Sequence, residues 1–356
     1  MCYLGFGERA APTVRQVHVV KRNFEGKSAM SKRQTRRRFF ATLSSAGLAG
    51  VVAAQKASAI EPPLETTKIT LAQISGICIA PQYVAEELLK LEGFTDIQYL
   101  QAIANSFAAV ASGQADLSMA FVAPLIVQAD AGMPIVLLGG VHTGCFELFG
   151  AEHVRAVRDL KDKVVAVPEP NSAHQLFVAS LATYVGLDPA RDIKFVFHPP
   201  ADSIGLLADG KIDALMGFPP LPQELRERKI GRVIMNSGSD RPWSQYSCCV
   251  VAATREFVQK HPVAAKRALR AILKATDYCA AEPERAAQMV ASRGYRYDYA
   301  LQTLREISYA RWREYDVEDA VRFYSLRLRE AGMIKSSPNK IISQVMDLRL
   351  FNELKA

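Results

Sequence analysis

Two groups of small and polar residues in this 356-residue chain stand where a predicted strand gives way to a predicted helix. They are Ser75, Gly76, Asn171, Ser172 and His174. Free backbone N–H groups at a helix start, together with hydroxyl, amide or imidazole side chains, can bind a carboxylate, a sulfonate or a similar anionic group. The alternative for each group is helix capping, in which the same side chains satisfy the N–H groups of the helix itself.

Four further candidates come at or after the carboxyl ends of other predicted strands. Phe121 ends one apolar segment and could form an apolar wall, with core packing as the alternative. His142, Thr143 and Cys145 follow the continuous apolar segment 135–138, which is typical of a strand buried on both faces. Ligands of open α/β sheets bind beyond such strand ends, so we expect these residues near a ligand. A satisfied structural histidine is the alternative for His142.

Aromatic and acidic residues supply the remaining candidates. Phe218 and Glu224 flank the stiff pair Pro219-Pro220. Trp243 and Tyr246 lie at a predicted crossing between two halves of the chain, where they could stack on a flat or apolar ligand. Hinge packing is the alternative for this pair. Few full cations occur in these segments, which favours a small organic solute over a nitrate-like ion.

The basic residues are concentrated at the N-terminus. Residues 1–59 contain 11 of the 44 Lys and Arg residues but 2 of the 36 Asp and Glu residues, although the whole chain has a net charge of +8. The remainder is therefore close to neutral, which excludes a broad nucleic-acid-binding surface.

The basic segment resembles a bacterial twin-arginine export signal. Paired arginines including Arg36 and Arg37 precede two aromatics, an Ala-rich apolar run and a small-x-small sequence ending at Ala59. We interpret 30–59 as a signal peptide cleaved near Ala59, and 1–29 as a disordered upstream extension. A basic tail beside a chance apolar segment is the alternative. Export would place the mature protein in the periplasm.

Five cysteines follow the predicted leader. They are Cys78, Cys145, Cys248, Cys249 and Cys279. Disulfides are permitted in the periplasm, but the sequence does not determine whether any form. Cys248 and Cys249 lie in an apolar segment and are expected in the core. No cysteine spacing is typical of a zinc or iron–sulfur site, so neither a metal nor a cofactor is predicted.

Strand and helix signals alternate in two successive units, which predicts an α/β fold with mainly parallel sheets flanked by helices. We assign residues 68–150 and 247–356, including a helical C-terminal tail, to lobe 1, and residues 155–245 to lobe 2. The segments 147–159 and 239–247 are the predicted crossings. The two crossings should lie together, with His142–Cys145 facing Trp243–Tyr246.

Four short motifs carry a resemblance to a known family. They are Gly113–Asp116, Ala131–Ile135, Asp159–Lys163 and Gly210–Ala214. In this order and spacing they are similar to those of the nitrate/sulfonate/taurine class of ABC-transporter substrate-binding proteins. The resemblance covers roughly residues 66–335. The family usually has glycine where this chain has Asp162.

The resemblance implies a two-lobed periplasmic-binding-protein fold, type II-like. It further implies an exported, monomeric receptor that binds a small organic solute of anionic or aromatic character in the cleft between its lobes. The receptor would deliver the solute to an ABC permease in the inner membrane, and the leader would engage the export machinery. An enzyme similar to the thiamine-pyrimidine synthases on the same fold, and a receptor-like sensor, are the alternatives.

Overall fold

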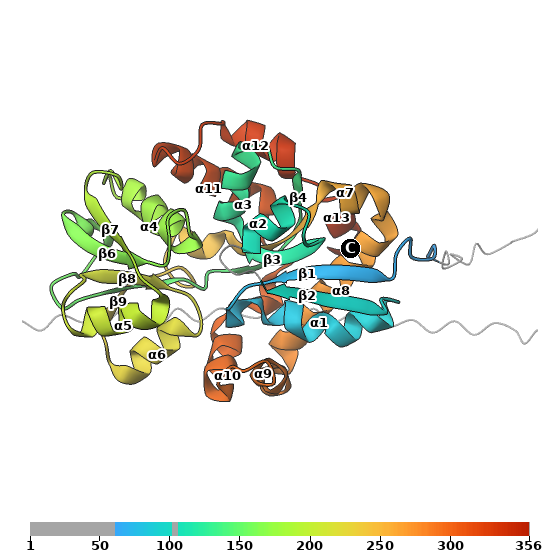
Figure 1. Ribbon diagram of the computed structural model, residues 1–356, viewed down its shortest axis with the longest axis horizontal. Helices are drawn as coiled ribbons and strands as arrows, with labels where there is room; N and C mark the ends of the chain where they lie inside the picture. The colour runs from blue at the N-terminus through green and yellow to red at the C-terminus, as the bar shows by residue number, and fades with distance from the viewer. Residues whose placement is uncertain (1–60, 102–105, 356) are drawn as a thin grey trace, which may run out of the picture. The chain divides into compact units, whose positions relative to one another are not determined.

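The computed structural model describes residues 61–101 and 106–355, which form two five-stranded sheets flanked by helices (Figure 1). The predicted extension 1–29 and signal peptide 30–59 lie outside the described residues. Among the described residues, no helix combines the length and the hydropathy that a membrane span requires. The predicted α/β fold with two sheets and a helical C-terminal region is confirmed.

The two sheets share one strand order. The first sheet is ordered β2-β1-β3-β10-β4 and the second β7-β6-β8-β5-β9. The first contains β1 (Lys68–Gln73), β2 (Asp96–Gln101), β3 (Leu117–Phe121), β4 (Ile135–Thr143) and β10 (Ser247–Thr254). The second contains β5 (Glu147–Gly150), β6 (Lys163–Val167), β7 (Ile193–Phe197), β8 (Ala214–Gly217) and β9 (Arg232–Asn236). Only β10 and β5 run antiparallel to their neighbours, so the sheets are mainly parallel, as predicted.

Helices cover both faces of each sheet (Figure 1). In lobe 1, which we define by the first sheet, they are α1 (Ala80–Leu91), α2 (Ser106–Ala111) and α3 (Val122–Asp130). In lobe 2, defined by the second sheet, they are α4 (Ala173–Tyr184), α5 (Pro200–Ala208) and α6 (Leu221–Arg228). This double coverage buries every residue of β3 and β4, which explains their continuous apolar sequences.

A Gly-x-x-Asp motif occurs immediately before the third parallel strand of each lobe. Asp116 accepts a hydrogen bond from the Thr70 N–H of β1 (2.8 Å). Asp213 accepts the equivalent bond from the Val164 N–H of β6 (2.8 Å). Each aspartate therefore ties the start of one strand to its neighbour, and two of the four family-like motifs have the same structural role in both lobes.

The departure from the family motif falls in a turn that requires a left-handed residue. Asp162 has a φ of +60°, in the region where glycine pays no steric penalty. Aspartate tolerates this conformation better than most side chains. The substitution therefore preserves the turn before β6.

The chain passes from lobe 1 to lobe 2 at residues 144–146. Strand β5 pairs with β8 and β9 in the second sheet, so the predicted lobe 1 boundary at residue 150 and the predicted crossing at 147–159 are wrong. All four residues of β5 are buried, and a strand this short and uniformly buried has no alternating pattern to mark it. The chain returns to lobe 1 between β9 and β10, at residues 237–246.

The C-terminal part of the chain is helical. It contains α7 (Arg255–Lys260), α8 (Pro262–Ala281), α9 (Pro283–Ala291), α10 (Tyr297–Glu306), α11 (Val317–Glu330), α12 (Pro338–Val345) and α13 (Arg349–Lys355). Helix α8 packs along α1 of lobe 1, whereas α11 contacts both α3 of lobe 1 and α4 of lobe 2. The tail therefore belongs mainly to lobe 1 but also reaches lobe 2.

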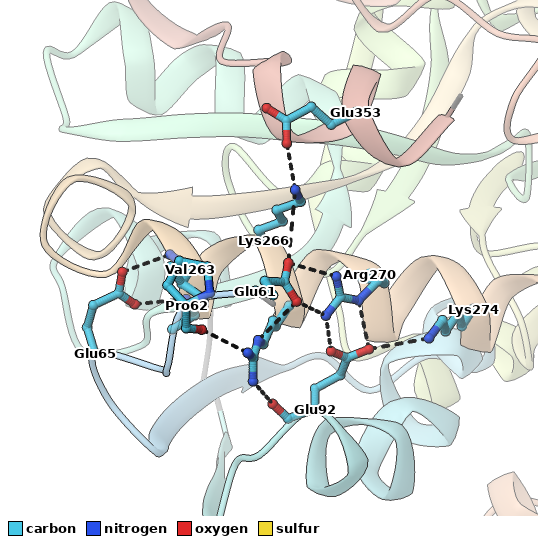
Figure 2. Close-up of polar contacts among 11 residues, drawn as sticks. Glu61, Pro62, Glu65, Glu92, Val263, Lys266, Arg270, Lys274 and Glu353 are labelled. Carbon is cyan, nitrogen blue, oxygen red and sulfur yellow. Dashed lines mark hydrogen bonds and ion pairs between the residues drawn. The ribbon is translucent and has the colours of Figure 1, made fainter. Parts of the chain in front are cut away.

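An ion-pair network on α8 holds the segment that precedes β1 (Figure 2). Arg270 donates to both carboxylate oxygens of Glu61 (2.9 and 2.7 Å) and also pairs with Glu92 at the end of α1. Glu65 accepts hydrogen bonds from two backbone N–H groups in the first turn of α8 (2.9 and 3.0 Å), where a negative charge is favoured. We refer to Glu61, Glu92 and Arg270 as the α8 network.

Candidate functional site

The loop before α1 in lobe 1 contacts the loop after β8 in lobe 2. The Phe218 ring lies so close to Gly76 that a Cβ added there would come within 2.7 Å of it. The Ile77 N–H donates to the Pro219 carbonyl (3.0 Å). Two predicted residues, Gly76 and Phe218, are therefore in direct contact, whereas Ser75 is exposed beside them.

The start of α4 supplies the second predicted group. Ser172 is the N-cap residue, and its hydroxyl accepts from the Gln175 N–H (3.3 Å), so the capping alternative is observed for this residue. Asn171 precedes it in the left-handed region with a φ of +59° and is exposed. His174 is buried, and burial lowers its pKa to about 4. Its imidazole is therefore neutral at physiological pH.

Aromatic rings from both lobes pack together around Phe146 of the first crossing. Its ring centroid lies 4.9 Å from that of Phe121, 5.0 Å from Phe177 and 5.4 Å from Phe218. The His174 ring lies 4.9 Å from Phe218. Tilted and edge-to-face pairs of this kind contribute about 0.5–1.5 kcal/mol each beyond the burial of their surface.

The aromatic pair of the second crossing extends this cluster toward α11. Trp243 contacts Phe177 at 5.1 Å, and Tyr246 stacks on Phe323 at 4.1 Å with an interplanar angle of 10°. The hinge-packing alternative is thus the arrangement observed for both residues. We call the whole set the aromatic cluster: Phe121, Phe146, His174, Phe177, Phe218, Trp243, Tyr246, Phe323 and Tyr324.

Five members of this cluster were predicted from the sequence, and the other four were not. Phe146 lies between two strands, where no periodic pattern indicates its environment. For Phe177, no pattern in the α4 sequence shows which face of that helix contacts the other lobe. Tyr324 carried a usable signal, because it lies on the apolar face of α11 with Val321 and Leu328. Its partner across the lobes is determined only by the fold.

His142 and Thr143 are the last two residues of β4, and not residues of a loop beyond it. The predicted strand ended at Leu138 because glycine interrupts the apolar run. Gly139 instead continues the strand and leaves room for Phe351 of α13, whose ring would lie 2.3 Å from an added Cβ. The loop prediction is therefore wrong for both residues.

The His142 imidazole is fully buried and contacts two carbonyl oxygens. Nδ1 lies 2.8 Å from the Thr143 oxygen, and Nε2 lies 3.1 Å from the Cys78 oxygen. The Tyr309 hydroxyl donates to the same Cys78 oxygen (2.8 Å). These contacts hold the backbone of Cys78, so His142 has the structural role that was the alternative for it.

Four buried cysteines converge beside this histidine. Cys78 comes from the 3₁₀ helix η1 (Ile77–Ile79), Cys145 from the first crossing, and Cys248 and Cys249 from β10. The Sγ atoms of Cys145 and Cys248 are 3.7 Å apart, and those of Cys78, Cys145 and Cys249 all lie within 4.8 Å of one another. We call these four residues the thiol cluster. The cluster was not predicted from the sequence, because Cys78, Cys145 and the adjacent pair Cys248-Cys249 lie far apart along the chain.

The thiols of the cluster influence one another's pKa. Hydrogen bonds from Cys145 and Cys249 hold the pKa of Cys78 well below its ordinary value. Burial raises the pKa of Cys145. Burial alone would raise the pKa of Cys248, but hydrogen bonds with Cys145 and Cys249 outweigh it, so this pKa is also lowered.

The two crossings lie side by side. Thr143 lines a polar cavity of about 300 Å³ together with Arg241, Ser244 and Gln245 of the second crossing. The Trp243 ring, however, packs toward α4 and α11. The expected approach of the two segments is therefore seen at Thr143, whereas His142 and Cys145 face the thiol cluster.

Ion pairs join α6 of lobe 2 to α10 beside lobe 1. Arg296 makes two contacts with the Glu227 carboxylate (2.8 and 3.0 Å). Arg226 makes two contacts with Glu306 (3.0 and 2.9 Å). We call these the interlobe ion pairs. Glu224, a predicted ligand contact, instead pairs with an arginine one turn along α6 (3.0 Å).

Two α/β lobes joined by two crossings are the fold of the periplasmic binding proteins. Comparison with known proteins identifies the family. Residues 62–293 match the NMT1-like family, and the chain belongs to it. The predicted resemblance to the nitrate- and sulfonate-binding proteins is confirmed by relatives with those names.

Three relatives illustrate the range of similarity. The nitrate/nitrite binding protein NrtA of Nostoc sp. is 21% identical over 253 residues, 64% of this chain and 57% of that protein. The chain thus spans little more than half the length of this relative. The alkanesulfonate-binding protein SsuA from Xanthomonas axonopodis pv. citri, bound to MOPS, has a TM-score of 0.65 at 18% identity, covering 79% and 99% of the two chains. The desulfurization enzyme DSZB has a TM-score of 0.57 at 14% identity, covering 81% and 98%.

Proposed function

We propose that the mature chain is the periplasmic solute-binding component of an ABC importer. The observation that carries this proposal is the pair of sheets with one strand order, joined by two crossings and in direct contact at Gly76 and Phe218. Two lobes joined in this way can close around a ligand by bending at the crossings. The names of the nitrate- and sulfonate-binding relatives support the same function.

The chemistry of the aromatic cluster favours an organic solute. Its rings come from both lobes, and its one histidine is neutral at physiological pH because its pKa is about 4. An apolar or aromatic solute body would pack against these rings, as in most small-molecule sites. The backbone N–H groups at the start of α4, apart from that of Gln175, which Ser172 caps, would receive a carboxylate or sulfonate on the same solute. A bare inorganic anion would find little charge neutralisation among these rings.

Delivery requires partners outside this chain. The leader would direct export by the twin-arginine pathway, with cleavage near Ala59, and the closed, monomeric receptor would dock on a membrane permease. The interlobe ion pairs connect the lobes through residues that are not members of the aromatic cluster, so closure and solute contact would involve different residues.

Isothermal titration calorimetry against aromatic carboxylates, alkanesulfonates, pyrimidines, nitrate and bicarbonate tests this proposal. We expect an aromatic or amphipathic organic anion to bind, and Phe218→Ala to weaken its binding by at least about tenfold, or roughly 1.4 kcal/mol. Phe197→Ala is the matched control, because this phenylalanine of lobe 2 is 46% exposed at the end of β7. Tight binding of nitrate or bicarbonate alone, or equal effects of the two variants, would contradict the proposed solute class.

An enzyme is the second candidate, and the thiol cluster is the observation that favours it. Cys78 lies in η1, which directly follows Gly76, and Gly76 contacts Phe218, so a thiol lies near the interlobe contact. Turnover of any member of the same panel, detected by mass spectrometry without accumulation of a bound complex, would favour the enzyme over the receptor.

A further inference from the structure

The thiol cluster has the spacing of a metal-binding site. A tetrahedral Zn²⁺ with Zn–S bonds of about 2.3 Å places neighbouring sulfurs about 3.8 Å apart. The Sγ atoms of Cys145 and Cys248 are 3.7 Å apart, and Cys249 and Cys78 lie within 4.8 Å of Cys145 and of each other. Cys248 is outside the group of three sulfurs that lie mutually within 4.8 Å, so its side chain would have to rotate to share an ion with Cys78, Cys145 and Cys249.

An irregularity in β10 lets two consecutive cysteines contribute. Successive residues of a regular strand point to opposite faces. Here the pairing register shifts, because Ser247 pairs with Thr143 while Cys249 pairs with His142. Such a bulge redirects side chains locally, and the sulfurs of both Cys248 and Cys249 approach Cys145.

The surroundings hold the cluster in place. The Cys78 carbonyl contacts the His142 ring and the Tyr309 hydroxyl, so the backbone of this cysteine is fixed from two sides. All four thiols are buried. Outer contacts of this kind orient the ligands of a metal and shield it from water.

Neither simple packing nor a disulfide accounts for four thiols at one place. A cysteine buried for packing needs no sulfur partner, and Cys279, also buried, is outside the cluster. A disulfide between Cys145 and Cys248 would use two of the four thiols. Cys78 and Cys249 would remain close together in the core without a bond partner.

We propose that Cys78, Cys145, Cys248 and Cys249 bind a thiophilic d¹⁰ cation, Zn²⁺ or Cu⁺. Thiolate ligands select these ions, and binding releases the thiol protons to solvent. The site would join η1, the first crossing and β10, and would therefore restrain the hinge. This inference does not depend on the transport function, because no solute is involved.

Metal titration of the mature chain, purified with reductant and without oxygen, tests the proposal. Co²⁺ as a spectroscopic probe should give a near-ultraviolet thiolate-to-metal absorption that saturates at one ion per chain and is displaced by Zn²⁺. A parallel Cu⁺ titration against bicinchoninate distinguishes the two cations. Cys145→Ser should lower the affinity at least about tenfold, and the matched control Cys279→Ser should leave it unchanged.

Thermal melting of the metal-free variants, together with Cys248→Ala as a second variant, separates loss of binding from loss of fold. Zn²⁺ or Cu⁺ should raise the melting temperature of the wild-type chain and of Cys279→Ser, but not that of the cluster variants. The proposal is overturned if the reduced protein, with all thiols free, takes up neither ion. It is equally overturned if Cys145→Ser and Cys279→Ser bind metal equally.

Discussion

The α8 network and the interlobe ion pairs both consist of arginine and glutamate side chains, but they join different parts of the molecule. In the α8 network, Arg270 is 23% exposed and Glu92 is 11% exposed, and both belong to lobe 1. In the interlobe pairs, Arg296 is 52% exposed and Glu227 is 50% exposed, and they come from different lobes. Arg270 and Glu92 are therefore largely separated from solvent, whereas Arg296 and Glu227 are hydrated. Arg226 of the other interlobe pair is 29% exposed and lies between these two cases.

This difference indicates that the burial of an ion pair determines how much it stabilises the fold. Its location determines whether it also affects the closure of the lobes. Removing one partner of a buried pair leaves an uncompensated charge in the protein. An exposed pair contributes about 0–1 kcal/mol because water screens it. When such a pair spans two lobes, however, even this small free energy acts on the equilibrium between open and closed forms, and therefore on ligand affinity.

The largest expected effect comes from breaking the α8 network. Arg270→Ala should lower the free energy of unfolding by about 2–3 kcal/mol, because Glu61 and Glu92 lose their shared partner while partly buried. Urea denaturation followed by circular dichroism measures this change. The matched control is Arg305→Ala, which removes an exposed pair with Glu284 and should cost less than about 1 kcal/mol. Equal losses for both variants would remove the distinction by burial.

The dependence of stability on pH should differ between carboxylates whose pKa is lowered and a carboxylate whose pKa is raised. The hydrogen bond from Arg270 lowers the pKa of Glu61. Burial alone would raise the pKa of Glu92, but the contacts with Arg270 outweigh burial, so the pKa of Glu92 is also lowered. Their stabilisation is fully present above the ordinary pKa of 4.5 and is lost as pH falls through the lowered values. Burial raises the pKa of Glu147, so its contribution is fully present below 4.5 and is lost as pH rises through the raised value.

Unfolding free energies measured from pH 3 to pH 7 check these signs. Glu92→Gln should lose less stability than the wild type between pH 4.5 and pH 3. Glu147→Gln should lose less stability than the wild type between pH 4.5 and pH 7. The buried Oε2 of Glu147 has no hydrogen-bond partner among the described residues, which agrees with the raised pKa. Parallel profiles for the two variants would contradict the assignment.

The smallest effect on stability, and the most specific effect on binding, should come from the interlobe pairs. Arg296→Ala should change the free energy of unfolding by less than about 1 kcal/mol but weaken solute binding several-fold by favouring the open form. Charge exchange in the double variant Arg296→Glu with Glu227→Arg should restore binding. Small-angle scattering with and without solute reports the closure directly. Unchanged affinity in Arg296→Ala would show that this pair does not contribute to closure.

Local patterns in the sequence were sufficient to predict several elements of the fold. Apolar runs of strand length marked β3 and β6 at their observed bounds, and an alternation of apolar and polar residues marked β1. The Gly-x-x-Asp motifs marked the start of the third strand in each lobe, since the same backbone hydrogen bond is needed at both places. The charge difference between residues 1–59 and the remainder likewise required no structure.

The contacts between distant segments could not be predicted from local patterns. Strand β5 was missed because a four-residue strand has no readable period, and its pairing partners lie more than 60 residues away. The thiol cluster brings residues 78, 145, 248 and 249 together, and no local spacing in the sequence predicts this contact. Propensity and periodicity act over a few residues, whereas a site between lobes depends on which faces pack together. The candidate residues were therefore partly predictable, but their partners were determined by the fold.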